Sequence, residues 1–308
     1  MNFFDQFPVQ AFNHLELLAN QVVEGFIIGK HKSPFHGFSV EFAEHRLYNI
    51  GETTKDLDWK VYARTDKLFI KKFEEETNLR CQIVIDTSSS MYFPEEKLNN
   101  GLVLNKLKFS ALGAACIMNI LRKQRDAFGI SLFDEKLNFQ SQTKSSTTHY
   151  QLLLSFLEKW INDFDLNRKS STAQALHEIA DQIHKRSMVV IFSDMFDDTD
   201  KTDDLFGALQ HLKHNKHEVL LFHVVDKKLE IDFDFENRPY QFVDMETGEK
   251  VRLQAHQIKD RYVEKMQEYH NSIKNKCIQY RIDYHEADIN QGYDYILQSF
   301  LGKRKKMQ

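Results

Sequence analysis

The residue types best suited to chemistry lie in two short stretches, each of which directly follows a run of apolar residues. In the first stretch these residues are Asp86, Ser88 and Ser90, and in the second the residue is Asp194. Carboxylate and hydroxyl oxygens are hard ligands of the kind that Mg²⁺ or Mn²⁺ takes in proteins. A serine-rich turn that caps a helix has a similar composition. The first stretch alone therefore indicates either a divalent cation site or a helix cap.

Short apolar runs alternate with amphipathic stretches from residue 79 onward, and this alternation predicts the elements that position the two stretches. The expected strands are 81–85, 128–133, 188–192, 219–225 and 281–285, and the expected helices are 104–123, 149–160, 203–215, 255–276, 291–301 and one that begins near Ser171. A further strand at 136–139 pairs with 128–133 as a hairpin. We therefore predict an α/β fold with a doubly wound, mostly parallel sheet flanked by helices.

The order of these elements predicts where the candidate ligands meet. The carboxyl ends of parallel strands meet the ligand-binding loops at one edge of an open α/β sheet. If strands 81–85 and 188–192 are neighbours, Asp86 and Asp194 face one another there, and Ser170 can join them from the loop before the next helix. We expect no lysine or arginine in this site. The two carboxylates would then repel each other without a cation.

The domain organisation predicted from the sequence has three parts. Residues 1–78 form a helix and a β-rich extension with strands at 38–42 and 67–71, which are too short to bury a core and so pack on the main domain. Residues 79–302 form the main domain, with a hairpin insertion at about 227–254. Residues 303–308 are a basic, solvated tail.

Composition excludes several classes of protein. The net charge of −4 among 308 residues argues against nucleic acid as the main partner. No apolar run is long enough to span a bilayer, and no secretory signal is present at the start. Three widely separated cysteines, Cys81, Cys116 and Cys277, are typical of buried thiols in a reducing compartment, so a cytoplasmic location is expected.

The first stretch also resembles a known signature. Asp86-Thr-Ser88-Ser-Ser90 is similar to the Asp-x-Ser-x-Ser motif of von Willebrand factor A domains. The resemblance implies a metal-ion-dependent adhesion site, completed by a hydroxyl from a second loop and an aspartate after a later strand. Asp194 matches that aspartate. The second-loop position falls on Ser170, where the family usually has threonine, and Thr172 is the alternative.

Residues 41–64 narrow the resemblance. They are similar to the hallmark of a bacterial family with a von Willebrand A-like domain, numbered fifty-eight among the domains of unknown function. Arg46, Asp58, Trp59 and Arg64 match its Arg-x-Tyr, Asp-Trp and Ala-Arg positions. These four residues either bind a partner or form an ion-paired surface, the simpler interpretation. The resemblance implies a link to MoxR-type AAA+ ATPases, in chaperone-like or protein-maturation roles.

Three functions are consistent with these observations. The first is a metal-dependent adaptor that binds a partner's carboxylate through the cation. The second is a Mg²⁺-dependent phosphatase, although Ser88 stands where such enzymes have a second aspartate. The third is a scaffold with a vestigial metal site. No Gly-x-Ser-x-Gly elbow or phosphate-binding Gly-Lys-Ser/Thr loop is present, so we expect neither serine hydrolase nor ATPase activity. Because the sequence contains no catalytic motif that we identify, we expect that the chain is not an enzyme.

Overall fold

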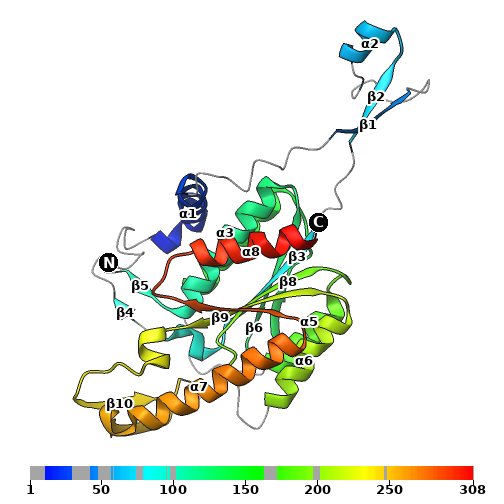
Figure 1. The fold of residues 1–308 in the computed structure, drawn as a ribbon. Coiled ribbons are helices and arrows are strands. Elements are labelled where there is room, and N and C mark those ends of the chain that lie inside the picture. The colour runs from blue at the N-terminus through cyan, green and yellow to red at the C-terminus, as the bar shows by residue number, and fades with distance from the viewer. Residues whose placement is uncertain are drawn as a thin grey trace. The chain divides into compact units, whose positions relative to one another are not determined.

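The computed structural model describes most of the chain, as two compact units (Figure 1). The described residues are 11–29, 42–47, 57, 59–73, 79–94, 96–97, 102–162, 172–196, 202–245 and 248–307. The large unit comprises Met1–Phe26 and Leu79–Gln308, and the small unit is Ile27–Asn78.

A six-stranded sheet forms the centre of the large unit. Its strand order is β12-β9-β8-β3-β6-β7, and all neighbouring pairs are parallel except β6 and β7. The strands are β3 (Arg80–Asp86), β6 (Ala127–Phe133), β7 (Leu137–Gln140), β8 (Met188–Ser193), β9 (Glu218–Val225) and β12 (Asp283–Asp288). The predicted fold class, the β6–β7 hairpin and the parallel pairing of β3 with β8 are confirmed.

Helices cover both faces of this sheet (Figure 1). On one face are α3 (Lys106–Lys123), α4 (Thr147–Asn162), α8 (Asp294–Met307) and α1 (Leu15–Gly29), which follows the short helix η2 (Ala11–Asn13). On the other are α5 (Thr172–Gln182), α6 (Thr202–His214) and α7 (Ala255–Gln279). The central strands are buried on both faces, which explains why their sequences are continuous apolar runs.

Helix α3 lies close to the sheet, because its middle turns carry small residues such as Gly113 and Ala114. A Cβ atom added at Gly113 would lie 3.1 Å from the ring of Phe192 in β8. The side chain of Asn105 caps the helix, since its Oδ1 accepts a hydrogen bond from the backbone N–H of Lys108 at 2.8 Å. The cap fixes where α3 begins, beside the carboxyl ends of the strands.

The predicted insertion is present between β9 and α7. It begins with a π-helical turn, η6 (Lys227–Ile231), and continues as the antiparallel hairpin β10 (Pro239–Val243) and β11 (Lys250–Gln254). Phe233 joins these pieces, because its ring packs on Phe242 of β10 and Tyr262 of α7. A second short pair, β4 (Glu96–Lys97) and β5 (Val103–Leu104), follows the 3-10 turn η4 (Ser89–Tyr92).

The small unit contains an antiparallel pair, β1 (Phe42–Leu47) and β2 (Phe69–Phe73), and the helix α2 (Trp59–Thr65). Its strands begin a few residues later than predicted. The small unit ends at Asn78, where the predicted extension also ends, whereas the first helix, up to Phe26, belongs to the large unit. Leu15 donates its backbone N–H to Glu158 of α4 at 2.7 Å, and Asn119 of α3 bonds to Asn20. The packing of residues 38–78 on the main domain stays a prediction.

The C-terminal tail was wrongly predicted to be solvated. Helix α8 continues to Met307, and Arg304 is 3% exposed, with its Nε 2.8 Å from Asp126 Oδ2. Lys303 Nζ lies 2.7 Å from Glu218 Oε2. Basic residues in the last turn are favoured by the helix dipole, and two of these find buried or half-buried carboxylates as partners. The end of the chain is therefore part of the large unit.

Candidate functional site

The loop after β3 presents the first group of candidate ligands. Asp86 is the last residue of the strand and is completely buried. The backbone N–H of Ser88 donates to Asp86 Oδ1 at 2.9 Å, and the hydroxyl oxygens of Ser88 and Ser90 are 3.0 Å apart. Thr87 anchors the loop, since its hydroxyl donates to the carbonyl of Phe133 at 2.7 Å. The loop thus holds Asp86, Ser88 and Ser90 close together.

The loop after β8 places Asp194 beside this group. Because β3 and β8 are parallel and Ile85 pairs with Phe192, the two strands end at the same level. The hydroxyl of Ser193 donates to Asp86 Oδ2 at 2.7 Å, which ties the two loops together. Asp194 Oδ1 accepts from the backbone N–H of Phe196 at 3.1 Å. The predicted meeting of these loops is confirmed.

The structure corrects the expectation that the site lacks a lysine. Lys106, the first residue of α3, places its ammonium 2.8 Å from Asp194 Oδ2 and 2.5 Å from Glu230 Oε1. Glu230 lies in η6, at the start of the insertion. Both residues are absent from the sequence prediction. Lys106 directly follows the capping Asn105, which places it beside the strand ends, whereas Glu230 has no local sequence signal.

The four charged groups perturb one another's pKa values. Burial, together with the charge of Asp194, raises the pKa of Asp86 to about 7. Burial alone would raise the pKa of Asp194, but the Lys106 ammonium outweighs it and lowers that pKa. Lys106 is itself buried, yet the two carboxylates raise its pKa above the usual value, so it stays protonated. Burial outweighs the same ammonium at Glu230 and raises its pKa.

The donor set fits a hard divalent cation. Adjacent ligands of octahedral Mg²⁺ lie about 2.9 Å apart, close to the 3.0 Å between the two serine oxygens, a separation that also suits their hydrogen bond. Each carboxylate oxygen of Asp86 and Asp194 already accepts one hydrogen bond and keeps a second lone pair, so these side chains can hold the cation directly or through water, which Mg²⁺ retains readily. When Asp86, Asp194 and Glu230 are all ionised, as cation binding favours, their charges and that of Lys106 sum to two negative charges, which matches one divalent cation.

The second loop contains two further candidate ligands, Ser170 and Thr172. Ser170 lies outside the described residues, and Thr172 is the first residue of α5 and is completely buried. In the described part of the chain, histidines, cysteines and carboxylates form no cluster of three or more suited to a metal. A cation here would therefore depend on hydroxyl oxygens as much as on carboxylates.

The four candidate partner-binding residues belong to the small unit. Trp59 opens α2 and is 62% exposed, with its ring set edge-on against Tyr62 at 6.2 Å. Arg64 is exposed in the last turn of the same helix, and Arg46 pairs with Ile70 across the hairpin. Asp58 lies outside the described residues. Trp59 and Arg64 are thus exposed side chains of α2, and their residue types are enriched in protein contact surfaces.

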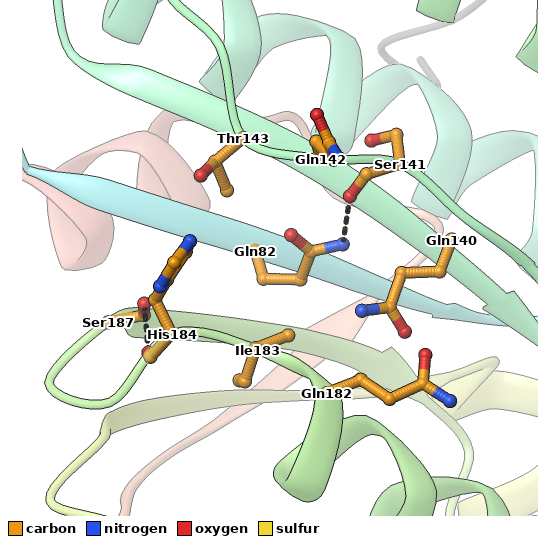
Figure 2. Close-up of a pocket in the computed structure, with 9 residues that line it drawn as sticks. All are labelled: Gln82, Gln140, Ser141, Gln142, Thr143, Gln182, Ile183, His184 and Ser187. Carbon is orange, nitrogen blue, oxygen red and sulfur yellow. Dashed lines mark hydrogen bonds between the residues drawn. The ribbon is translucent and has the colours of Figure 1, made fainter.

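A cavity of about 470 Å³ lies at the other end of the parallel strands, where β3 and β8 begin (Figure 2). Gln82, near the start of β3, and Ser187, just before β8, both line it, whereas Asp86 and Asp194 follow the ends of those strands. Its lining is uncharged apart from one histidine and is rich in amides: Gln82, Gln140, Ser141, Gln142, Thr143, Gln182, Ile183, His184 and Ser187. This cavity therefore offers no carboxylate to a cation and is separate from the candidate metal site.

The fold and the site together relate the chain to known proteins. Its architecture is the von Willebrand factor A-like one that the sequence predicts, with the Asp-x-Ser-x-Ser loop at the carboxyl edge of the parallel strands. Residues 44–272, most of the chain, match the model of a family described as "Protein of unknown function DUF58". The chain belongs to this family.

Individual relatives are less informative. The chain is 32% identical over 83 residues to uncharacterized proteins of two mycobacteria, Rv1480 of Mycobacterium tuberculosis and Mb1516 of Mycobacterium bovis. The match covers 27% of this chain and about a quarter, 26%, of each of those proteins. Among the described helices, none combines the length and apolar character that a membrane crossing needs.

Similar solved structures include two proteins from Bacteroides. BatB of Bacteroides thetaiotaomicron has a TM-score of 0.46 and 11% identity, over 74% of this chain and 98% of that one. An aerotolerance-related membrane protein of Bacteroides fragilis has a TM-score of 0.46 and 12% identity, over 73% and 99%. The von Willebrand A domain of SpRpn10 has a TM-score of 0.33 and 13% identity, over 48% and 76%.

Proposed function

We propose that this chain is a metal-dependent protein-binding module. The observation that carries the proposal is the juxtaposition of two serine hydroxyls, 3.0 Å apart, with two buried carboxylates at the ends of neighbouring strands. Burying two such carboxylates together is costly unless positive charge compensates them. Lys106 compensates Asp194, and Asp86 is left with hydroxyl and N–H partners. A divalent cation would compensate the rest.

Each residue has a role in this proposal. Ser88 and Ser90 provide neutral oxygens that would contact Mg²⁺ or Mn²⁺ directly. Asp86 and Asp194 orient water around the ion, and Ser170 or Thr172 adds a hydroxyl from the second loop. The bound cation supplies a positive position that accepts an Asp or Glu carboxylate of a partner protein. The side chains named here number fewer than the six ligands of octahedral Mg²⁺, which leaves room for that carboxylate.

The partner we propose is a MoxR-type AAA+ ATPase, or a client that such an ATPase remodels. Support comes from the resemblance of residues 41–64 to a family whose members are linked to these ATPases. In this account the chain is an adaptor with a chaperone-like or protein-maturation role. The exposed Trp59 and Arg64 of α2 provide a second contact surface that does not depend on metal.

The test is complex formation with the MoxR-type ATPase of the source organism. The two purified proteins are mixed with Mg²⁺ or with a chelator and separated by gel filtration. We expect a complex with Mg²⁺, its loss with chelator, and its recovery when Mg²⁺ is restored. Ser88→Ala and Asp194→Ala should prevent recovery, whereas Ser145→Ala, an exposed serine before α4, should not. Since the ATPase itself can require Mg²⁺, the variants decide the result: a complex formed equally by Ser88→Ala overturns the proposal.

A further inference from the structure

Lys106 is an ammonium group enclosed beside the candidate cation site. Its side chain is 2% exposed, and its two carboxylate partners, Asp194 and Glu230, are 4% and 22% exposed. A lysine is seldom buried so completely unless it is paired, and here the pairing is double. Lys106 therefore contributes a permanent positive charge within the candidate site.

The surrounding structure holds this charge in one place. Asn105 caps α3 at the residue before Lys106, and the backbone N–H of Lys106 donates to the carbonyl of Phe93 at 3.2 Å. Glu230 is fixed as well, since its Oε1 accepts from Lys106 and its Oε2 accepts from the backbone N–H of Asp226 at 2.8 Å. Both partners thus approach the ammonium from ordered positions.

We propose that Lys106 acts as a built-in cation that sets the charge of the metal site, with Glu230 as its counter-charge. This inference rests on the proposed metal site. Lys106 satisfies Asp194 Oδ2, so one divalent ion balances the remaining two negative charges. Glu230 reduces the repulsion between the ammonium and an incoming cation. Lys106 and Glu230 therefore determine the affinity of the site for a divalent cation without having to contact the ion.

The inference predicts opposite effects for two single variants. Lys106→Gln removes a positive charge and should strengthen Mn²⁺ binding, by a factor on the order of ten, because like charges a few ångströms apart interact strongly where solvent is excluded. Glu230→Gln removes a negative charge and should weaken binding by a similar factor. The double variant restores the net charge, and its affinity should return close to that of the wild type. Lys106→Arg keeps the charge and serves as the conservative control.

The experiment is titration calorimetry of the full chain with Mn²⁺ and, separately, Mg²⁺, with thermal unfolding of each metal-free variant to confirm folding. A purely structural role for Lys106 predicts a less stable protein whose affinity is unchanged or weaker, and that result overturns the inference. If Lys106→Gln does not fold, Glu230→Gln decides: unchanged affinity in that variant equally overturns it. A wild type that binds neither metal defeats the proposed function itself, which distinguishes the two failures.

Discussion

At the scale of single residues, Asp86 is the group on which the candidate site depends most. It is completely buried, and burial and Asp194 together raise its pKa to about 7. Its ionised form is thus unfavourable in the metal-free protein, although Ser88 and Ser193 donate hydrogen bonds to it. A buried carboxylate whose charged form destabilises the metal-free fold does not contribute to its stability. We therefore infer that the role of Asp86 is to bind a ligand.

The variant Asp86→Asn tests this interpretation. It removes the buried charge and its repulsion with Asp194, while the amide oxygen can still accept from Ser88. We expect the metal-free variant to be more stable than the wild type above neutral pH, by roughly 1 kcal/mol or more. Urea unfolding in the presence of chelator measures this difference. A variant markedly less stable than the wild type would show that Asp86 is a structural residue.

The sequence predicted some residues of the site and missed others for a physical reason. Asp86, Ser88, Ser90 and Asp194 lie within a few residues of apolar strands, so strand periodicity and loop position were enough to bring them together. Lys106 reaches Asp194 across 88 residues of chain and Glu230 across 124. Such pairing depends on how α3 and the insertion pack against the sheet, which no local pattern encodes.

At the scale of elements, the turn between α6 and β9 contains a buried titratable group. His217 is completely buried, and the backbone N–H of Ser187 donates to its Nδ1 at 3.3 Å. Burial lowers the pKa of His217 below its ordinary value. Protonation therefore favours the unfolded state, and the contribution of His217 to stability is present above about pH 6.5 and lost as the pH falls below it.

His217→Gln removes this dependence because glutamine does not titrate in this range, and its amide oxygen can still accept from the backbone N–H of Ser187. The free energy of unfolding should fall more steeply for the wild type than for the variant between about pH 7.5 and about pH 5.5, roughly one unit on either side of the ordinary pKa of histidine. Urea unfolding at several pH values measures both slopes. Parallel slopes would show that His217 keeps an ordinary pKa in the folded chain.

The last turn of α8 makes a second prediction at this scale. Arg304 and Asp126 form an ion pair of 2.8 Å in which the side chains are only 4% and 6% exposed. Arg304→Ala leaves Asp126 without this partner and should cost about 3 kcal/mol or more. Lys305→Ala, on the exposed side of the same turn, should change stability by less than about 0.5 kcal/mol. Equal effects in chemical denaturation would contradict the packing of α8.

The error about this tail shows the limit of composition as a guide. Lys303, Arg304, Lys305 and Lys306 look like a solvated terminus because four consecutive basic residues usually are. In the structure, helix α8 begins at residue 294 and continues through these residues. Arg304 pairs with Asp126 and Lys303 with Glu218, and such contacts between distant parts of the chain cannot be read from composition. In contrast, the six-stranded sheet was predictable, because continuous apolar runs between amphipathic helices admit few other arrangements.

At the scale of the whole molecule, the chain divides into a large and a small unit, and the small unit ends at Asn78, where the predicted extension ends. Helix α1 belongs to the large unit, where it buries Leu15, Leu18, Ala19, Val22 and Val23. The sequence predicts a helix in this part of the chain but not the surface that covers it, which α3 and α4 provide in part. Residues 27–78, which carry the family hallmark, form the small unit.

Removal of residues 1–26 should therefore damage the large unit. Deleting α1 exposes an apolar surface of α3 and α4 to water, and at about 25 cal/mol per Å² of apolar surface several buried side chains contribute several kcal/mol. We expect the fragment 27–308 to melt well below the full chain and to aggregate. Thermal unfolding and light scattering measure both effects. A monodisperse fragment with an unchanged melting temperature would mean that α1 adds little to the core.

The central claim is that a divalent cation binds at Asp86, Ser88, Ser90 and Asp194, and one measurement tests it most directly. The full chain is unfolded thermally with and without Mg²⁺ or Mn²⁺, in parallel with Ser88→Ala and the control Ser145→Ala. Ligand that binds only the folded state stabilises it by about 2.7 kcal/mol at a hundredfold excess over Kd. We predict that metal raises the melting temperature of the wild type and of Ser145→Ala but not of Ser88→Ala. An equal rise in all three proteins, or a rise in none, would contradict the claim.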